Sequence, residues 1–328
     1  MADSSKTSVI AALAGNSVVL VSKTVGFMVT GSGAMLSEAI HTLADLLNQI
    51  LLFVGITRSE READHEFPAG YGRERYVWAL ISAVGIFFLG CGVTIYHGVT
   101  GLFHPHAMEN PGWAIGVLGV SFVLEAVVFV IALRGLKKAA AGRPFFSYLR
   151  TEADPSAAAV LLEDFAACLG VLLALGAIGL TSFTGALYWD ALGSIAIGVL
   201  LGVVAIALII RNHQLLVGPA VPPDVRQTIH RILREHPTVE RVVRLRARVI
   251  DLDNYDVTAT IDFDGPKIAE RIEAQLAEAL KNTDTDPKAL AVSVTEEILS
   301  AIGEEINRIE EAIRAEVPQA RFLDIEAD

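Results

Sequence analysis

The chain has 328 residues, 52% of them hydrophobic and only 7% aromatic, and a formal net charge of −12. Its mean hydropathy of +0.48 is too high for an ordinary soluble domain and favours a membrane protein. Neither half carries the excess of basic residues that nucleic-acid binding favours, which argues against a nucleic-acid partner.

Six nearly uncharged segments follow one another along the first two thirds of the chain. Each has the roughly 20 residues that a helix needs to cross a lipid bilayer. They lie near 8–29, 35–56, 77–101, 113–133, 157–180 and 189–210. We therefore expect residues 1–211 to form an all-α membrane domain of six transmembrane helices.

The loops between these segments differ in charge, and this predicts their orientation. Two loops are basic, with Arg58, Arg61, Arg73 and Arg75 in one and Arg134, Lys137, Lys138, Arg143 and Arg150 in the other. The three opposite loops have no Lys or Arg. Because Lys and Arg are retained in the cytoplasm during insertion, we predict that both termini are cytoplasmic. The start "MADSSKTS" resembles neither a signal peptide nor an Arg-rich transit segment, so we expect a multi-pass protein of a bacterial plasma (inner) membrane.

Motifs of enzymes and of cysteine-based metal sites do not occur in the sequence. There is no H-E-x-x-H, G-x-S-x-G or P-loop pattern, and "HEFPAGYG" lacks the second His of a zincin motif. Cys91 and Cys168 both fall inside predicted spans, where they are interpreted as small packing residues. The sequence therefore gives little support for an enzyme.

The second predicted span contains Glu38, His41 and Asp45 in an otherwise apolar stretch. A carboxylate near the middle of a bilayer costs about 2.5–3.5 kcal/mol on insertion scales, so such a group normally has a partner or a function. His41 and Asp45 are four residues apart and project from one face of a helix, where both can reach a single ion. We interpret them as half of a metal site, and we place Glu38 nearer the outer interface.

The fifth predicted span supplies a second acidic pair, Glu163 and Asp164, in "AVLLEDFAACLGV". Asp164 lies about 12 Å of helical rise inside the cytoplasmic end of its span, and Asp45 lies at a similar depth on a span of opposite direction. One imidazole nitrogen with two or three carboxylates suits Zn²⁺, whereas a site with oxygen ligands alone favours Mn²⁺ or Mg²⁺.

Plainer interpretations of these polar groups remain open. The His–Asp pair could be a structural hydrogen bond, and Lys23 in the first span could neutralise Asp45, Glu125 or a neighbour. Glu125 and His97 are interpreted as packing or pathway groups. Asp190, directly before "ALGSIAIGVLLG", is expected to cap the sixth span.

The remaining part of the chain, 212–328, carries 23 acidic against 14 basic residues and has no segment long enough to span a membrane. We predict a cytosolic α+β domain there, built as an open-face sandwich. The pattern predicts helices at 223–236, 266–281 and 288–317, strands at 239–250, 255–263 and 320–326, and a turn at "DLDN". His213, His230 and His236 are interpreted as surface histidines, and Asp64 with His65 as solvated loop charge.

Several motifs, taken together, resemble the cation diffusion facilitator family over nearly the whole chain. They are "SEAIHTLADLLNQ" for the second span, "FPAGYGRERYVWALISA" for the start of the third, "DALGSIAIG" for the sixth and "LLVGPAVPPDVRQTIHRILREHPTVERVVRLRAR" for the junction to the cytosolic domain. "GNSVVLVSK", "LLEDFAA" and "EEILSAIGEEINRIEEAIR" are most similar to the branch typified by the mitochondrial zinc exporter.

The resemblance implies a Zn²⁺/H⁺ antiporter that is a homodimer, with a metallochaperone-like dimerisation domain and a transport site between the second and fifth spans. His41, Asp45 and Asp164 match the ligand positions of the family. One position departs from its pattern, because Val160 stands where the fifth-span motif has a histidine. Glu163 is the nearest replacement, and Asn48 or a water molecule is the other.

We therefore expect a lipid-embedded exporter of Zn²⁺ from the cytoplasm, with H⁺ as the counter-ion. Loading the metal requires neutral His41 and ionised carboxylates, so metal and protons compete for the site. Mn²⁺, Fe²⁺, Co²⁺ and Cd²⁺ are alternative substrates, because the missing histidine makes the site richer in oxygen. A cation channel and a non-transporting scaffold that senses metal are the alternatives from other classes.

Overall fold

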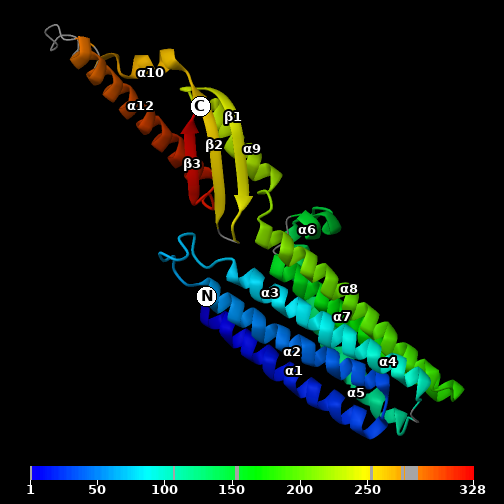
Figure 1. Ribbon diagram of the computed structural model, residues 1–328. Coiled ribbons are helices and arrows are strands. Elements are labelled where there is room, and N and C mark those ends of the chain that lie inside the picture. Colours follow the sequence, from blue (N-terminus) through cyan, green and yellow to red (C-terminus); the bar gives the residue numbers. More distant parts are fainter. Residues whose placement is uncertain (1, 106–107, 152–154, 252–253, 275–276, 278–286) are drawn as a thin grey trace. The chain divides into compact units, whose positions relative to one another are not determined.

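The computed structural model describes residues 2–105, 108–151, 155–251, 254–274, 277 and 287–328 (Figure 1). The chain divides into two compact units, unit 1 (Met1–Val217) and unit 2 (Gly218–Asp328). Each unit is considered by itself below.

Unit 1 is helical throughout its regular elements in the described residues (Figure 1). In chain order they are α1 (Ala2–Thr30), α2 (Gly33–Ser59), α3 (Glu74–Gly85), the π-helical segment η1 (Ile86–Val93), α4 (Thr94–Phe103), α5 (Pro111–Ala140), the short α6 (Phe145–Thr151), α7 (Pro155–Thr184) and α8 (Tyr188–Val217). Helix α2 packs against α1, α3 and α8, and α7 packs against α5 and α8.

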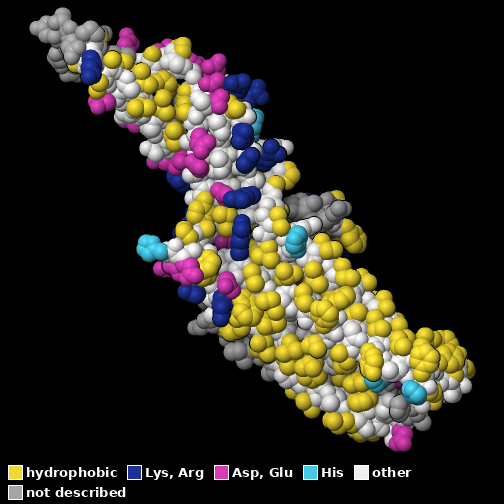
Figure 2. Space-filling view, viewed as in Figure 1, with side chains coloured by type: hydrophobic (Ala, Val, Ile, Leu, Met, Phe, Trp, Pro, Cys, Tyr) yellow, Lys and Arg dark blue, Asp and Glu magenta, His cyan; other side chains and the backbone are white. Residues whose placement is uncertain are grey.

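Five helical stretches among the described residues are long and apolar enough to cross a membrane, and they coincide with the predicted second to sixth spans. They are Gly33–Ser59, Glu74–Phe103, Pro111–Ala140, Val160–Thr184 and Tyr188–Val217. Hydrophobic side chains cover the face of unit 1 shown in Figure 2, as expected for helices that contact lipid. The prediction of a helical membrane domain is confirmed; counting α1 as a sixth span remains an expectation.

The third span is not a regular helix, which the apolar pattern did not indicate. It changes from α3 through the π-helical segment η1 into α4. There it meets α8 at glycines: a Cβ atom at Gly98 would lie 2.9 Å from the backbone nitrogen of Ile195, and one at Gly198 would lie 3.1 Å from that of Ile95. Small residues allow such close helix contacts within membranes. The two helices therefore meet backbone to backbone.

Asp190 caps a helix other than its own. It lies inside the first turn of α8, yet its carboxylate accepts hydrogen bonds from Ser32 Oγ (2.6 Å) and from the backbone nitrogens of Gly33 (2.5 Å) and Ala34 (3.3 Å) at the beginning of α2. A carboxylate at a helix N-terminus satisfies N–H groups that have no partner within the helix. The expectation that Asp190 caps the sixth span is therefore wrong, because neighbouring α2 uses it.

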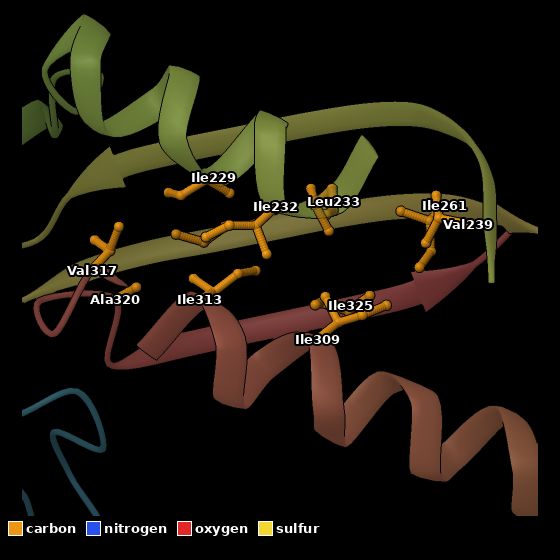
Figure 3. Close-up of a cluster of buried hydrophobic side chains, with 12 residues drawn as sticks. Ile229, Ile232, Leu233, Val239, Ile261, Ile309, Ile313, Val317, Ala320 and Ile325 are labelled. Atoms are coloured by element: carbon orange, nitrogen blue, oxygen red, sulfur yellow. The ribbon is translucent and has the colours of Figure 1, made fainter. Parts of the chain in front are cut away.

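Unit 2 is a small α+β unit with a three-stranded sheet in the order β1-β2-β3. Its elements are α9 (Pro223–Glu235), β1 (Val239–Val249), β2 (Tyr255–Phe263), α10 (Gly265–Arg271), α12 (Pro287–Glu316) and β3 (Phe322–Ala327). Strands β1 and β2 are antiparallel, whereas β2 and β3 are parallel and are joined through the helices. Figure 3 shows α9 and α12 contributing isoleucines to one core against the strands, among them Ile229, Ile309 and Ile313.

The predicted elements of unit 2 agree with the structure except in one helix. Helix α10 covers only Gly265–Arg271 of the expected 266–281, and much of the rest of that range lies outside the described residues, as does part of the predicted "DLDN" turn. The metallochaperone-like type of this unit stays an expectation from the resemblance.

Candidate metal transport site

Helix α2 presents a row of polar side chains along one buried face. Glu38, His41, Thr42, Asp45 and Asn48 recur at intervals of three or four residues, which places them on neighbouring turns of the same side. All are buried except Asp45, whose side chain is 24% exposed. Ser32 caps the start of the helix, since its hydroxyl oxygen accepts a hydrogen bond from the backbone nitrogen of Met35. The row is thus fixed by helix periodicity and by a well-capped start.

His41 and Asp45 lie side by side without a hydrogen bond between them. His41 Nδ1 is 3.6 Å from Asp45 Oδ1, which is too long for one. Neither buried imidazole nitrogen of His41 has a hydrogen-bond partner among the described residues. A buried polar atom without a partner is costly, and in native proteins it commonly marks a functional site or an unseen ion or water. The interpretation of the pair as a structural hydrogen bond is therefore not supported.

Helix α7 brings the second acidic pair to face α2. Asp164 Oδ2 is buried and has no hydrogen-bond partner among the described residues. Glu163 Oε2 accepts a hydrogen bond from Asn48 Nδ2 (2.8 Å), and Asn48 Oδ1 accepts one from Ser82 Oγ (2.6 Å). The two candidates for a fourth ligand thus come from facing helices and are bonded to each other. Val160 is 40% exposed and apolar.

The five candidate residues do not form one coordination sphere in this conformation. Across the described part of the chain, no three His, Cys, Asp or Glu side chains are grouped closely enough to hold an ion. The carboxylates of Asp45, Asp164 and Glu163 are nevertheless near enough to repel one another. A divalent cation between them would relieve that repulsion. Assigning these residues as ligands remains a prediction.

A cavity of about 180 Å³ begins at the Asn48–Glu163 contact. It lies among α2, α3, α7 and α8 and extends towards the helix ends that adjoin the basic loops, where Arg75 and Arg211 line it. Its other lining residues are Leu52, Ile56, Tyr76, Ala79, Leu208 and Asn212. Asn48 and Glu163 are thus the two predicted ligands that line this cavity. The cavity extends towards the side of the basic loops, which is the predicted cytoplasmic side.

Lys23 does not neutralise Asp45. Its Nζ atom lies 2.9 Å from Glu38 Oε2 and 2.9 Å from Glu125 Oε1, and it donates a third hydrogen bond to Thr42 Oγ1 (3.0 Å). The pairing with Glu125 was one interpretation that the sequence allowed, whereas the pairing with Glu38 was missed. The signal for it was Thr42 and Glu38 themselves, which share one turn of α2. Glu38, expected nearer the outer interface, is fully buried in protein.

Of the three histidines interpreted as surface residues, His213 and His230 are exposed, but His236 is not. Its side chain is 14% exposed and lies against Thr238 and Glu305, with Nδ1 3.0 Å from Thr238 Oγ1. The surface interpretation of His236 is therefore wrong. Burial lowers the pKa of this imidazole, and the nearby Glu305 carboxylate opposes that effect.

The loop residue Asp64 organises its own turn. It accepts hydrogen bonds from Tyr71 Oη (2.7 Å) and from the backbone nitrogens of Glu66 (3.0 Å) and Phe67 (2.8 Å). These bonds hold the pKa of Asp64 below its usual value, the Tyr71 bond most strongly.

Comparison with known proteins gives the chain its family. Residues 9–217 match the model of the cation efflux transmembrane domain. The chain is 36% identical over 327 residues to a Xenopus laevis protein named proton-coupled zinc antiporter SLC30A9, mitochondrial, which covers 97% of this chain and 58% of that protein. It is 36% identical over 310 residues to metal tolerance protein C4 of Arabidopsis thaliana, covering 91% and 68%. It is 28% identical over 227 residues to the cation-efflux pump FieF of Shewanella oneidensis, covering 69% and 71%.

The chain spans little more than half the length of the vertebrate zinc antiporters it matches, 58% of the Xenopus and 55% of the human protein. The family match covers all of the described candidate ligands, since α2 and α7 both lie within residues 9–217. The interpretation as a transporter instead of an enzyme is confirmed by this match. The chain belongs to the cation diffusion facilitator family of cation efflux transporters.

Proposed function

We propose that this chain is a proton-coupled antiporter that exports Zn²⁺ from the cytoplasm through a site between α2 and α7. His41 and Asp45 would bind the ion from α2, Asp164 and Glu163 from α7, and Asn48 is the alternative fourth ligand. The single observation that carries the proposal is the set of buried atoms without hydrogen bonds on the two facing helices, both His41 nitrogens and Asp164 Oδ2.

The charges around the site favour a cation as its occupant. Lys23, the buried lysine that could have neutralised Asp45, is already held by Glu38 and Glu125. Asp45, Glu163 and Asp164 therefore retain no basic partner within 4 Å among the described residues except His41, which binds a metal only when it is neutral. Because intramembrane carboxylates are costly, a divalent ion in transit is a physical reason for three of them to lie on these two facing helices.

Assembly of the site requires a small rearrangement. Glu163 is bonded to Asn48, so its carboxylate reaches an ion only after that hydrogen bond breaks. Asn48 can remain bonded to Ser82 when this happens. Alternatively, Glu163 stays where it is and a water molecule completes the tetrahedron that zinc prefers. Either route completes the site without the histidine that Val160 replaces.

Proton coupling follows from ligand chemistry. The carboxylates and the imidazole must lose their protons to bind zinc, so zinc loading releases protons and protonation weakens zinc binding. The cavity beside Asn48 and Glu163 supports access from the side of the basic loops, from which the ion would load. The names of the vertebrate relatives describe proton-coupled zinc antiport, which agrees with the proposal.

The arrangement in the membrane is also part of the proposal. We count α1 as a sixth span, take residues 1–211 as the transport domain and 212–328 as a cytosolic dimerisation and regulatory domain, and place both termini in the cytoplasm of a homodimer. We expected a bacterial plasma membrane, whereas the vertebrate relatives are named as mitochondrial proteins. Localising the tagged chain in its own cell distinguishes these membranes.

Zinc flux into proteoliposomes under a pH gradient tests the site. We expect Asp45→Asn and Asp164→Asn to reduce zinc uptake to the level of empty vesicles, because both remove a ligand charge. Glu60→Gln, which changes an exposed loop carboxylate, is the matched control and should transport normally. Wild-type flux in Asp45→Asn would reject the site, and downhill flux of the wild type that ignores the pH gradient would indicate a channel. No flux at all would indicate the scaffold.

A second substrate class is favoured by one observation. Val160 offers no nitrogen donor, so the site is rich in oxygen, which suits Mn²⁺ better than a site with two imidazoles would. Comparing the proton flux that Zn²⁺, Mn²⁺, Fe²⁺, Co²⁺ and Cd²⁺ elicit in the same vesicles decides the substrate. A response to Mn²⁺ larger than that to Zn²⁺ would replace zinc in the proposal.

A further inference from the structure

One buried lysine lies between the buried Glu38 and the partly exposed Glu125 where α1, α2 and α5 meet. We call Lys23, Glu38 and Glu125 the lysine cluster. Lys23 Nζ lies 2.9 Å from an oxygen of each glutamate and donates its third hydrogen bond to Thr42. The side chains of Lys23 and Glu38 are 0% exposed and that of Glu125 is 18% exposed. All three donors of the ammonium group are therefore used inside the protein.

The lysine cluster has one positive charge and two groups that can be negative. With both glutamates ionised it would carry a net charge of −1 inside a membrane protein, which is strongly unfavourable. The second oxygens, Glu38 Oε1 and Glu125 Oε2, are buried and have no hydrogen-bond partner among the described residues. An ionised oxygen in that position would be neither solvated nor paired. The cluster is therefore neutral when one glutamate holds a proton.

The other titratable groups that act on Glu125 do not remove the imbalance. They are Glu38 and His41 on α2 and Asp164 and Cys168 on α7. Glu38, Asp164 and Cys168 can only add negative charge. His41 is neutral whenever it is available for a metal. Among these groups, Lys23 is thus the one permanent cation that faces Glu125.

We propose that the lysine cluster is a second proton-binding site, in which Glu125 holds a proton in the metal-free protein and releases it when a divalent cation binds between α2 and α7. The inference rests on the proposed antiport function, but it concerns residues that do not touch the metal. The O–H bond of the Glu125 carboxylic acid breaks, the proton passes to solvent, and a carboxylate remains beside Lys23.

The side chain of Glu125 is partly exposed, whereas that of Glu38 is not, so Glu125 is the glutamate that we assign to exchange the proton. Glu38 Oε1 is pressed against α7, where a Cβ atom on Gly170 would lie only 2.5 Å from it. The side chain of Glu125 is instead 18% exposed, and its neighbour Leu124 lines a groove of about 660 Å³ between α1 and α5. That groove is lined from Asn110, which precedes α5, to Ser121 and Leu124, and on α1 it includes Ser22, the neighbour of Lys23. Ser22, Asn110 and Ser121 are the polar side chains of this lining, whose other members are apolar residues and glycines.

The link between the two sites is electrostatic. Glu125 and Asp164 are close enough for their charges to interact, so two positive charges at the metal site favour the ionised form of Glu125. Linkage is reciprocal: a proton on Glu125 weakens metal binding by the same factor by which metal binding expels the proton. Each metal ion that binds would therefore release one proton from Glu125, which is not one of the proposed metal ligands.

The test counts protons. The full-length protein in detergent is titrated with Zn²⁺ in weakly buffered solution, with a pH dye, and zinc affinity is measured between pH 6 and 8. Glu125→Gln keeps an acceptor for Lys23 and leaves a balanced Lys23–Glu38 pair, so we expect it to fold. It should release about one proton fewer per zinc ion than the wild type. For each pH unit, the factor by which its zinc Kd changes should therefore be about tenfold smaller than in the wild type.

A second variant and a control make the outcome decisive. Charge balance predicts the same loss of about one proton for Glu38→Gln, because Lys23 then pairs with Glu125 alone. Glu60→Gln should behave as wild type. Wild-type proton release by Glu125→Gln would overturn the inference. Asp45→Asn separates the two proposals: if it abolishes zinc binding while Glu125→Gln keeps the wild-type proton count, only the lysine cluster is wrongly assigned. Undiminished zinc binding by Asp45→Asn would instead overturn the proposed transport site.

Discussion

Gly170 of α7 lies beside the buried carboxylate of Glu38, and replacing it with alanine gives a sharp prediction. The added Cβ atom would lie 2.5 Å from Glu38 Oε1, which is closer than real Cβ atoms approach other atoms. Glu38 is fully buried and bonded to Lys23. Its carboxylate can therefore move away only by breaking that bond.

The magnitude follows from two opposing effects. Alanine in place of glycine within a helix is stabilising by about 0.5–1 kcal/mol. Loss of a hydrogen bond to a charged group costs about 1.5–3 kcal/mol. Gly170→Ala should therefore lower the free energy of unfolding by about 0.5–2.5 kcal/mol. Gly176→Ala, on the same helix, has open space around the new Cβ and should raise it slightly.

Unfolding the two variants in mixed detergent micelles, with the wild type alongside, measures this difference. Gly176→Ala controls for helix propensity, because it lies on α7 and adds the same methyl group. If Gly170→Ala were as stable as Gly176→Ala, Glu38 would have room to move without cost. The contact of Glu38 with α7 would then not contribute to the stability of the helix packing.

Three further perturbations have expected outcomes. Lys23→Met leaves Glu38 and Glu125 without their cation and should lower the free energy of unfolding by about 3–5 kcal/mol in the same assay; adding Glu38→Gln and Glu125→Gln should restore most of it, and a loss below about 1 kcal/mol for the single variant would contradict the pairing. Val160→His restores the imidazole of the family motif and should tighten zinc binding relative to Mn²⁺ by about tenfold or more in competition titrations, whereas an unchanged ratio would show that position 160 does not face the site. Because burial lowers the pKa of His236, the unfolded chain takes up its proton first as the pH falls, so unit 2 is at full stability above about pH 6.5 and loses stability as the pH falls towards the folded-state pKa. Hydrogen exchange in α12 should show that loss between pH 7 and 5, and should show less of it in His236→Asn.

Much of the fold could be predicted because membrane helices can be recognised in a sequence by their length and apolarity. The second to sixth spans and the strands of unit 2 follow directly from the two periodicities, with ends that differ by a few residues. The π-helical segment Ile86–Val93 could not be predicted, because widening a helix by one residue leaves its composition unchanged. Helix α6 was missed because its seven residues are too few to show a period.

The candidate site was predictable by residue type and less so by partner. Helix spacing alone puts His41 beside Asp45, as the structure has them. Which acid Lys23 meets depends on how α1, α2 and α5 pack, and a single sequence carries no signal of that packing. The prediction that Asp190 caps its own helix was wrong for the same reason. A local rule assigns the residue to that helix, but the start of α2 offers unpaired N–H groups at close range.

The hydrogen bonds of Asp190 affect how the start of α2 separates from the start of α8. Its carboxylate joins the start of α8 to the start of α2, at the opposite end from the basic loops. Pulling these helix ends apart strips the backbone nitrogens of Gly33 and Ala34 of their acceptor and exposes a bare carboxylate. Water must take over those hydrogen bonds as they break. The starts of α2 and α8 therefore separate more readily when water reaches Asp190, and excluding water from this end favours the associated state.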